Sequence, residues 1–141
     1  MSAAAGATGE SPVASKLGLT SGQIVQELGW DDDVDEELRA SIEDALEADM
    51  VDGEYGNVVD TVLLWWRNDD GDLVDGLVDS LTDLVGGGVI WLLTPKVGRP
   101  RSVDAADIAE AAPIAGLAQT TSATASRDWA ATRLVAPKPP A

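Results

Sequence analysis

The sequence of 141 residues contains no cysteine, no histidine and no phenylalanine. Without cysteine the chain can form neither a disulfide nor a thiolate nucleophile, and cysteine usage gives no indication of its redox compartment. Without histidine it lacks the usual base of a serine hydrolase triad and the ligands of the common zinc sites. Acid–base chemistry would therefore fall to carboxylates, lysines such as Lys96, or Tyr55.

Basic residues are also scarce, since 9 lysines and arginines stand against 25 aspartates and glutamates, for a net charge of −16 and a pI near 4.1. Between residues 27 and 83 there are 20 acidic residues and only two bases, Arg39 and Arg67, whereas beyond residue 83 there are 4 acids and 6 bases. An acidic surface repels phosphates and anionic lipid, so neither nucleic acid nor a membrane is an expected partner. Two poles of opposite sign favour a basic protein partner or self-association, although solubility alone explains them as well.

No apolar run approaches the roughly 20 residues that span a bilayer, and residues 1–15 lack the basic start and apolar centre of a signal peptide. We therefore expect a cytoplasmic protein. Residues 1–15 are rich in alanine, glycine, serine and threonine, and residues 137–141 are rich in proline. Both ends are predicted to be disordered, which leaves residues 16–136 as a single domain.

The longest apolar run, residues 58–66, predicts a central strand buried on both faces. Before it we expect a strand over 23–28 and an amphipathic helix from residue 34 to 46. After it we expect a helix over 73–84, ended by Gly86-Gly87-Gly88, and a strand over 89–93. A helix over 103–112, capped by Ser102 and limited by Pro113, and two strands within 117–125 and 132–136 complete the domain. This alternation predicts a Rossmann-like α/β fold. It should have a mostly parallel open sheet, helices on both faces and a C-terminal antiparallel hairpin at one edge.

In an open α/β sheet, ligands bind beyond the carboxyl ends of the strands, so the residues that follow the strands form the candidate site. The candidate residues for binding a ligand or a partner are Glu27, Gly29, Trp30, Asp31, Asp32, Asp33, Trp66, Arg67, Asp69, Asp70 and Lys96. A plainer alternative is that the aspartates only cap the two following helices while the basic loop 96–101 balances their charge. No residue is predicted to be catalytic. No metal ligand is predicted either, because an EF-hand loop with Gly71 at its sixth position would begin at Trp66.

The five tryptophans divide into core and contact candidates. Adjacent residues of a strand point to opposite faces, so Trp65 and Trp66 cannot share a pocket. Trp65 and Trp91 are expected in the core. Trp30 and Trp129 fall in predicted turns and are the expected contact residues.

Several motifs resemble an actinobacterial domain-of-unknown-function family, the one numbered three-zero-five-two. They are Glu27-Leu28-Gly29-Trp30-Asp31-Asp32-Asp33, Leu63-Leu64-Trp65-Trp66-Arg67, Asp69-Asp70-Gly71-Asp72-Leu73-Val74-Asp75, Ile90-Trp91-Leu92-Leu93-Thr94-Pro95-Lys96 and Asp107-Ile108-Ala109-Glu110-Ala111-Ala112-Pro113. The resemblance extends from Leu17 to Lys138. This resemblance implies no particular activity for the protein.

The order of elements also resembles an abridged class I methyltransferase. In that family an acidic residue at the end of the first strand precedes a glycine-rich loop that cradles S-adenosylmethionine, and Glu27 and Gly29 match its start. Trp30 and the three aspartates after it stand where the later glycines would be, and such side chains deny close backbone approach. The resemblance therefore implies a kept fold with a broken cofactor loop, and no cofactor is expected.

The leading hypothesis is a non-catalytic interaction or regulatory module with an unknown protein partner, for which a basic protein is the candidate. The alternative is a small-ligand or S-adenosylmethionine-binding enzyme that uses Glu27 and the loop of residues 31–33.

Overall fold

The computed structural model describes residues 16–138, so the predicted tail of residues 1–15 and the last three residues of the predicted proline-rich end lie outside it. Within this range the elements are β2 (Val25–Leu28), α3 (Glu36–Leu46), β3 (Val59–Trp65), α4 (Leu73–Ser80), β4 (Leu84–Pro95), α5 (Ala105–Ile114), β5 (Ala118–Thr124) and β6 (Trp129–Val135). Pro137 belongs to the packed chain, because its carbonyl accepts a hydrogen bond from Gly87 N (3.2 Å).

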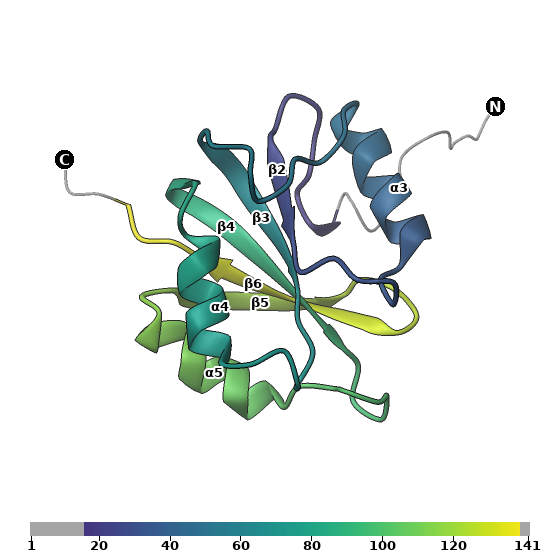
Figure 1. Cartoon of the computed structure of the whole chain (residues 1–141), viewed down its shortest axis with the longest axis vertical. Helices are drawn as coiled ribbons and strands as arrows, with labels where there is room; N and C mark the ends of the chain where they lie inside the picture. The colour runs from purple at the N-terminus through teal and green to yellow at the C-terminus, as the bar shows by residue number, and fades with distance from the viewer. Residues whose placement is uncertain (1–15, 139–141) are drawn as a thin grey trace.

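The strands form one five-stranded sheet in the order β2-β3-β4-β6-β5 (Figure 1). β2, β3 and β4 pair in parallel, which confirms the predicted crossovers, and β5 and β6 form the predicted antiparallel hairpin at the edge. The expectation of a mostly parallel sheet was slightly overstated. β6 inserts between β4 and β5 and runs antiparallel to both, so two of the four neighbouring pairs are antiparallel.

Helices cover both faces of the sheet, as the sequence predicts (Figure 1). Leu63 and Trp65 of β3 pack on the face beneath α3, together with Ile42. Val62 and Leu64 point to the other face, where α4 and α5 lie. Full burial of each such aliphatic side chain contributes about 1.5–3 kcal/mol, so the run at β3 stabilises the packing of helices on both faces of the sheet.

Helix α3 keeps its predicted apolar stripe but begins later than the aspartate run suggested. Its N-cap is Asp35, whose carboxylate accepts a hydrogen bond from Leu38 N (3.0 Å). The three aspartates before it are therefore not the cap of this helix. The N-cap of α4 is Asp72, whose carboxylate accepts a hydrogen bond from Val74 N (2.8 Å).

The glycine run does not end a helix, so that prediction was wrong. Helix α4 stops at Ser80, and β4 already begins at Leu84, where it pairs with Val59 of β3. The glycines therefore lie inside a strand. Gly88 is required there because a Cβ would come within 2.6 Å of Leu84 Cδ1. Tertiary pairing overrides the local preference of glycine for a helix end.

Two smaller boundaries also differ from expectation. The cap of α5 is Asp104 instead of Ser102, and Pro113 lies inside the last turn of the helix. β6 begins at Trp129, so the predicted turn before it is shorter. Among the described residues, no helix has both the length and the apolar character that crossing a membrane would require.

Candidate functional site

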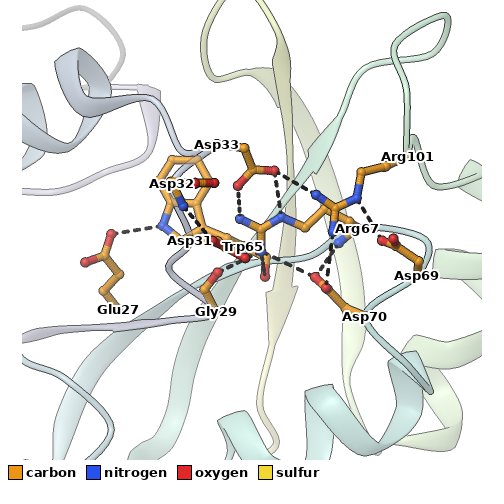
Figure 2. A network of polar contacts seen from close by, with 10 residues as sticks. All are labelled: Glu27, Gly29, Asp31, Asp32, Asp33, Trp65, Arg67, Asp69, Asp70 and Arg101. Atoms are coloured by element: carbon orange, nitrogen blue, oxygen red, sulfur yellow. Dashed lines mark hydrogen bonds and ion pairs between the residues drawn. The ribbon is translucent and has the colours of Figure 1, made fainter.

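The loops that follow β2, β3 and β4 meet at one edge of the sheet, as expected for parallel neighbours in register. Leu28 pairs with Leu64 and Trp65 with Leu93, so the three strands end at nearly the same level. Asp33 comes from the first loop, Arg67 and Asp70 from the second, and Arg101 from the third (Figure 2). Residues of the predicted candidate site are therefore brought together at this edge of the sheet, which we refer to as the mouth.

Gly29 has a packing role at this edge. Its φ is +76°, and a Cβ on this residue would overlap the carbonyl oxygen of Trp65. The chain leaving β2 thus crosses directly over the end of β3. Only glycine tolerates both the left-handed conformation and the contact between the two backbones. Gly29 is therefore explained by the packing of the two backbones.

Arg67 occupies the centre of the mouth and is only 2 % exposed (Figure 2). Its Nη1 donates to the carbonyl oxygen of Gly29 (2.7 Å) and to Asp70 Oδ2 (3.3 Å). Its Nε donates to Asp33 Oδ2 (3.0 Å), and its Nη2 donates to the other oxygen of Asp33. The guanidinium carbon lies 5.4 Å from the ring centroid of Trp129, within cation–π range.

The ion pair of Arg67 and Asp33 holds both groups in their charged forms. The hydrogen bond from Arg67 lowers the pKa of Asp33, against the opposing effect of burial. Burial by itself lowers the pKa of Arg67, but its bonds to Asp33 and then to Asp70 outweigh this effect and raise it. The bidentate geometry matches a planar guanidinium to a carboxylate, and a lysine could not reproduce it.

Arg101 joins the third loop to this network (Figure 2). Its Nε lies 2.9 Å from Asp69, and its Nη1 lies 3.4 Å from Asp33. Asn68 N also donates to the carbonyl oxygen of Arg101 (3.0 Å). The acidic and basic segments of the sequence thus meet within one molecule at this point. Arg99 pairs instead with Asp128 (2.9 Å), and Lys96 forms no ion pair within residues 16–138.

Glu27 points toward α3 and away from the mouth. Its two carboxylate oxygens accept from Arg39 Nε (2.6 Å) and Nη2 (2.7 Å), and one of them also accepts from Trp65 Nε1 (2.9 Å). The hydrogen bond with Glu27 is the main cause that raises the pKa of Arg39. Glu27 therefore fastens α3 to the sheet, and a role in holding a ligand would require breaking that pair.

The tryptophans are placed partly as predicted. Trp65 and Trp91 are buried in the core, and Trp66 points to the opposite face from Trp65. Trp30 is 54 % exposed, in keeping with its expected position on the surface. Trp129 is not a surface contact residue, because it is 4 % exposed and packs edge-on against Trp65 with ring centroids 4.8 Å apart. Its ring also packs against the guanidinium group of Arg67.

A crevice of about 420 Å³ lies between the loop after β2 and the inner side of α4. We refer to it as the tryptophan crevice. Its lining residues are Leu28, Gly29, Trp30, Asp31, Leu64, Trp65, Trp66, Arg67, Asp70, Gly76, Asp79 and Ser80. Six of the eleven predicted site residues thus line it, namely Gly29, Trp30, Asp31, Trp66, Arg67 and Asp70. Gly76, Asp79 and Ser80 were missed, because nothing in the sequence shows which side of α4 faces the loop.

The remaining predicted residues take other positions. Asp32 is exposed, Asp69 holds Arg101 at the outer rim, and Lys96 follows β4 without lining the crevice. No group of three or more carboxylates within the described residues is arranged to hold a metal ion. The arrangement is suited to holding a cationic group between aromatic and acidic side chains.

Comparison with solved structures shows a methyltransferase-like fold. A putative methyltransferase from Thermoplasma acidophilum matches with a TM-score of 0.59 at 11 % identity, over 91 % of this chain and 75 % of that one. The magnesium protoporphyrin IX methyltransferase of Synechocystis PCC 6803, solved with bound S-adenosylmethionine, matches with a TM-score of 0.54 at 11 % identity, over 88 % and 74 % of the two chains. At such identity the likeness concerns the fold alone.

Sequence comparison confirms the resemblance that the motifs indicated. An uncharacterized protein of Mycobacterium tuberculosis is 51 % identical over 125 residues, which cover 89 % of this chain and 78 % of that protein, and an uncharacterized protein of Mycobacterium bovis matches to the same extent. The sequence model of one family matches residues 14–138. The chain therefore belongs to the family described as Protein of unknown function (DUF3052).

Proposed function

We propose that this protein is a non-catalytic interaction module that binds a basic segment of a partner protein at the mouth formed by its strand ends. The observation that carries the proposal is the position of Arg67. Its guanidinium fills the place between the ends of β2 and β3, with its donors directed to Gly29, Asp33 and Asp70. Because a paired side chain of the protein itself fills this place, a partner can approach the strand ends only beside Arg67, at the exposed residues around it.

The groups left exposed around that centre are acidic or aromatic. Trp30, Asp31 and Asp32 project from the first loop, and Asp69 from the second. Positive charge near them is already engaged, because Arg67 and Arg101 are both paired. Such a surface attracts cationic partners and repels phosphates. Exclusion of nucleic acid and membranes, self-association and a cytoplasmic location stay predictions.

A methyltransferase-like enzyme is the second candidate, favoured by the fold and by the match of Glu27 and Gly29 to the start of a cofactor loop. Both residues have other roles here: Glu27 pairs with Arg39, and Gly29 packs on Trp65. S-adenosylmethionine would have to displace these contacts to bind as the family loop binds it. The geometry therefore favours the interaction module.

The test is binding of short synthetic peptides of graded positive charge, measured by fluorescence anisotropy. The double variant D31K/D32K should lose binding of the basic peptides, because it reverses charge at the mouth. The matched control D107K/E110K makes the same change of charge at two exposed residues of α5 that do not line the crevice, and it should bind nearly as the wild type does. Equal loss in both double variants, or no loss in D31K/D32K, would contradict the proposal.

A second measurement addresses the enzyme alternative directly. A ligand at about 100 times its dissociation constant adds roughly 2.7 kcal/mol to stability, which raises the melting midpoint of a domain of this size by a few degrees or more. We expect no rise with S-adenosylmethionine or its demethylated product. A rise with either compound would place the enzyme hypothesis first.

A further inference from the structure

The tryptophan crevice is lined by two indole rings of different exposure. Trp66 is half-buried, and its ring lies against α4 at Gly76, where a Cβ would come within 2.5 Å of it. Gly76 thus permits the close contact of this indole with the helix. Trp30 is mostly exposed on the loop after β2, so most of its ring is accessible to an occupant. Leu28 and Leu64 provide an apolar floor.

Two of the three carboxylates that line the crevice lack a basic partner among the described residues, whereas Asp70 pairs with Arg67. Asp31 and Asp79 both line it, both are exposed, and neither forms an ion pair with any residue between 16 and 138. Arg67 is the only base in the lining, and its donors are directed to Asp33, Asp70 and Gly29. An occupant that completes this site therefore carries positive charge.

The shape and chemistry of the site select an organic cation over a metal ion. Within the described chain no three carboxylates converge as a metal would need, whereas two indole rings flank the space. A cation over an indole face is attracted by the negative face of the ring, and more strongly when it is desolvated. A planar guanidinium can stack on Trp30 and donate to a carboxylate at once, and an apolar stem suits the leucine floor.

We propose that the tryptophan crevice receives one arginine side chain from the basic segment of the partner, with the guanidinium between Trp30 and Trp66 and paired with Asp31 or Asp79. This inference rests on the proposed function and names the group that is recognised. A volume of about 420 Å³ lies at the lower end of the range for ligand sites, which is suitable for one long side chain and its adjoining backbone.

The test uses a basic peptide that binds the wild type, together with versions in which each arginine in turn is replaced by lysine or by citrulline, its neutral isostere. One arginine should dominate: citrulline at that position should weaken binding about 10-fold or more, and lysine should weaken it less.

Variants of the protein test the same contact from the other side. W30A and D79N should each weaken binding about 5- to 10-fold, and W30F should retain most of the binding. V78A is the matched control, because Val78 is exposed on the same helix but does not line the crevice. Melting curves check that each variant is folded.

The outcomes separate this inference from the proposed function. If D31K/D32K abolishes peptide binding while W30A, D79N and citrulline have no effect, the acidic mouth is confirmed as a docking surface and the arginine pocket is wrong. If no basic peptide binds, agmatine is titrated into the protein and followed by amide and indole chemical shifts. Changes confined to Trp30, Trp66 and α4 would then support the pocket without the partner, and their absence would overturn both proposals.

Discussion

Arg67 was predicted to line the mouth, and the structure places it there, but buried and paired with Asp33 instead of exposed to a partner. Its carboxylate partner lies 34 residues away in the sequence. Local sequence indicates that a base and several acids end up near one edge of a sheet. It cannot indicate which acid the guanidinium selects, because that depends on the angle at which the first loop crosses β3.

Gly29 gives the sharpest prediction at the scale of one residue. G29A should destabilise the fold by about 3 kcal/mol or more, because the new methyl group adds overlap with the carbonyl oxygen of Trp65 to the strain of a positive φ. Urea unfolding measures the change. G18A is the control: φ is +71° and no atom lies within 4 Å, so only the backbone strain of about 1 kcal/mol should be seen. Equal losses in the two variants would show that the contact with Trp65 is unimportant.

The Asp33 carboxylate predicts a pH dependence. Its pKa is lowered in the folded state, so it stabilises the fold above its unfolded pKa near 4 and loses this effect as the pH falls through the folded value. D33N should therefore cost about 1–2 kcal/mol at neutral pH, with the difference from wild type shrinking below about pH 4. D128N removes an exposed pair and should stay within about 0.5 kcal/mol at every pH. A constant difference for D33N would mean that its ionisation has no part in stability.

At the scale of elements, α3 and α5 show how helix starts are fixed. Asp35 caps α3 through a bond to Leu38 N, whereas Asp104 precedes α5 without any side-chain cap bond. The aspartate run before α3 offered several possible caps, and the cap is Asp35, whose backbone is extended and whose side chain accepts from Leu38 N. The others are held by the loop itself or by Arg67.

Substitution of the caps tests this difference. D35A should lower the stability by about 1 kcal/mol, since it leaves the amide of Leu38 without its acceptor. D104A should lower it by only a few tenths, because no bond is lost. Thermal unfolding of both variants at the same ionic strength gives the comparison. A larger loss in D104A would overturn the assignment of the caps.

At the scale of the whole molecule, the net charge of −16 opposes the compact state through self-repulsion. Raising sodium chloride from about 0.02 M to about 0.5 M shortens the Debye length severalfold and should raise the melting midpoint. E37K/D44K changes two exposed acids of α3 to lysines and should reduce both the repulsion and the salt effect. If salt lowered the midpoint, the ion pairs around Arg67 and Arg101 would outweigh the repulsion.

The order of elements, the two-faced burial of the central strand and the acidic surface were determined by the sequence alone. Burial of β3 follows from an apolar run, and the stripe of α3 follows from its period, so both are local properties that survive in any context. Local patterns failed where another element supplied the decisive contact. The glycine run lies within β4 because that strand pairs with β3, and Trp129 is buried because it packs against Trp65.

The tertiary structure alone decided the chemistry of the mouth. It brings Asp33 to Arg67 across 34 residues and to Arg101 across 68, and it turns Asp79 and Gly76 of α4 toward Trp30 and Trp66. These contacts depend on the directions in which side chains of separate elements point. The periodicity of the sequence gives no information on those directions. Composition fixes how much negative charge the chain carries, whereas packing fixes which carboxylates are paired with a base within the described residues and which are not.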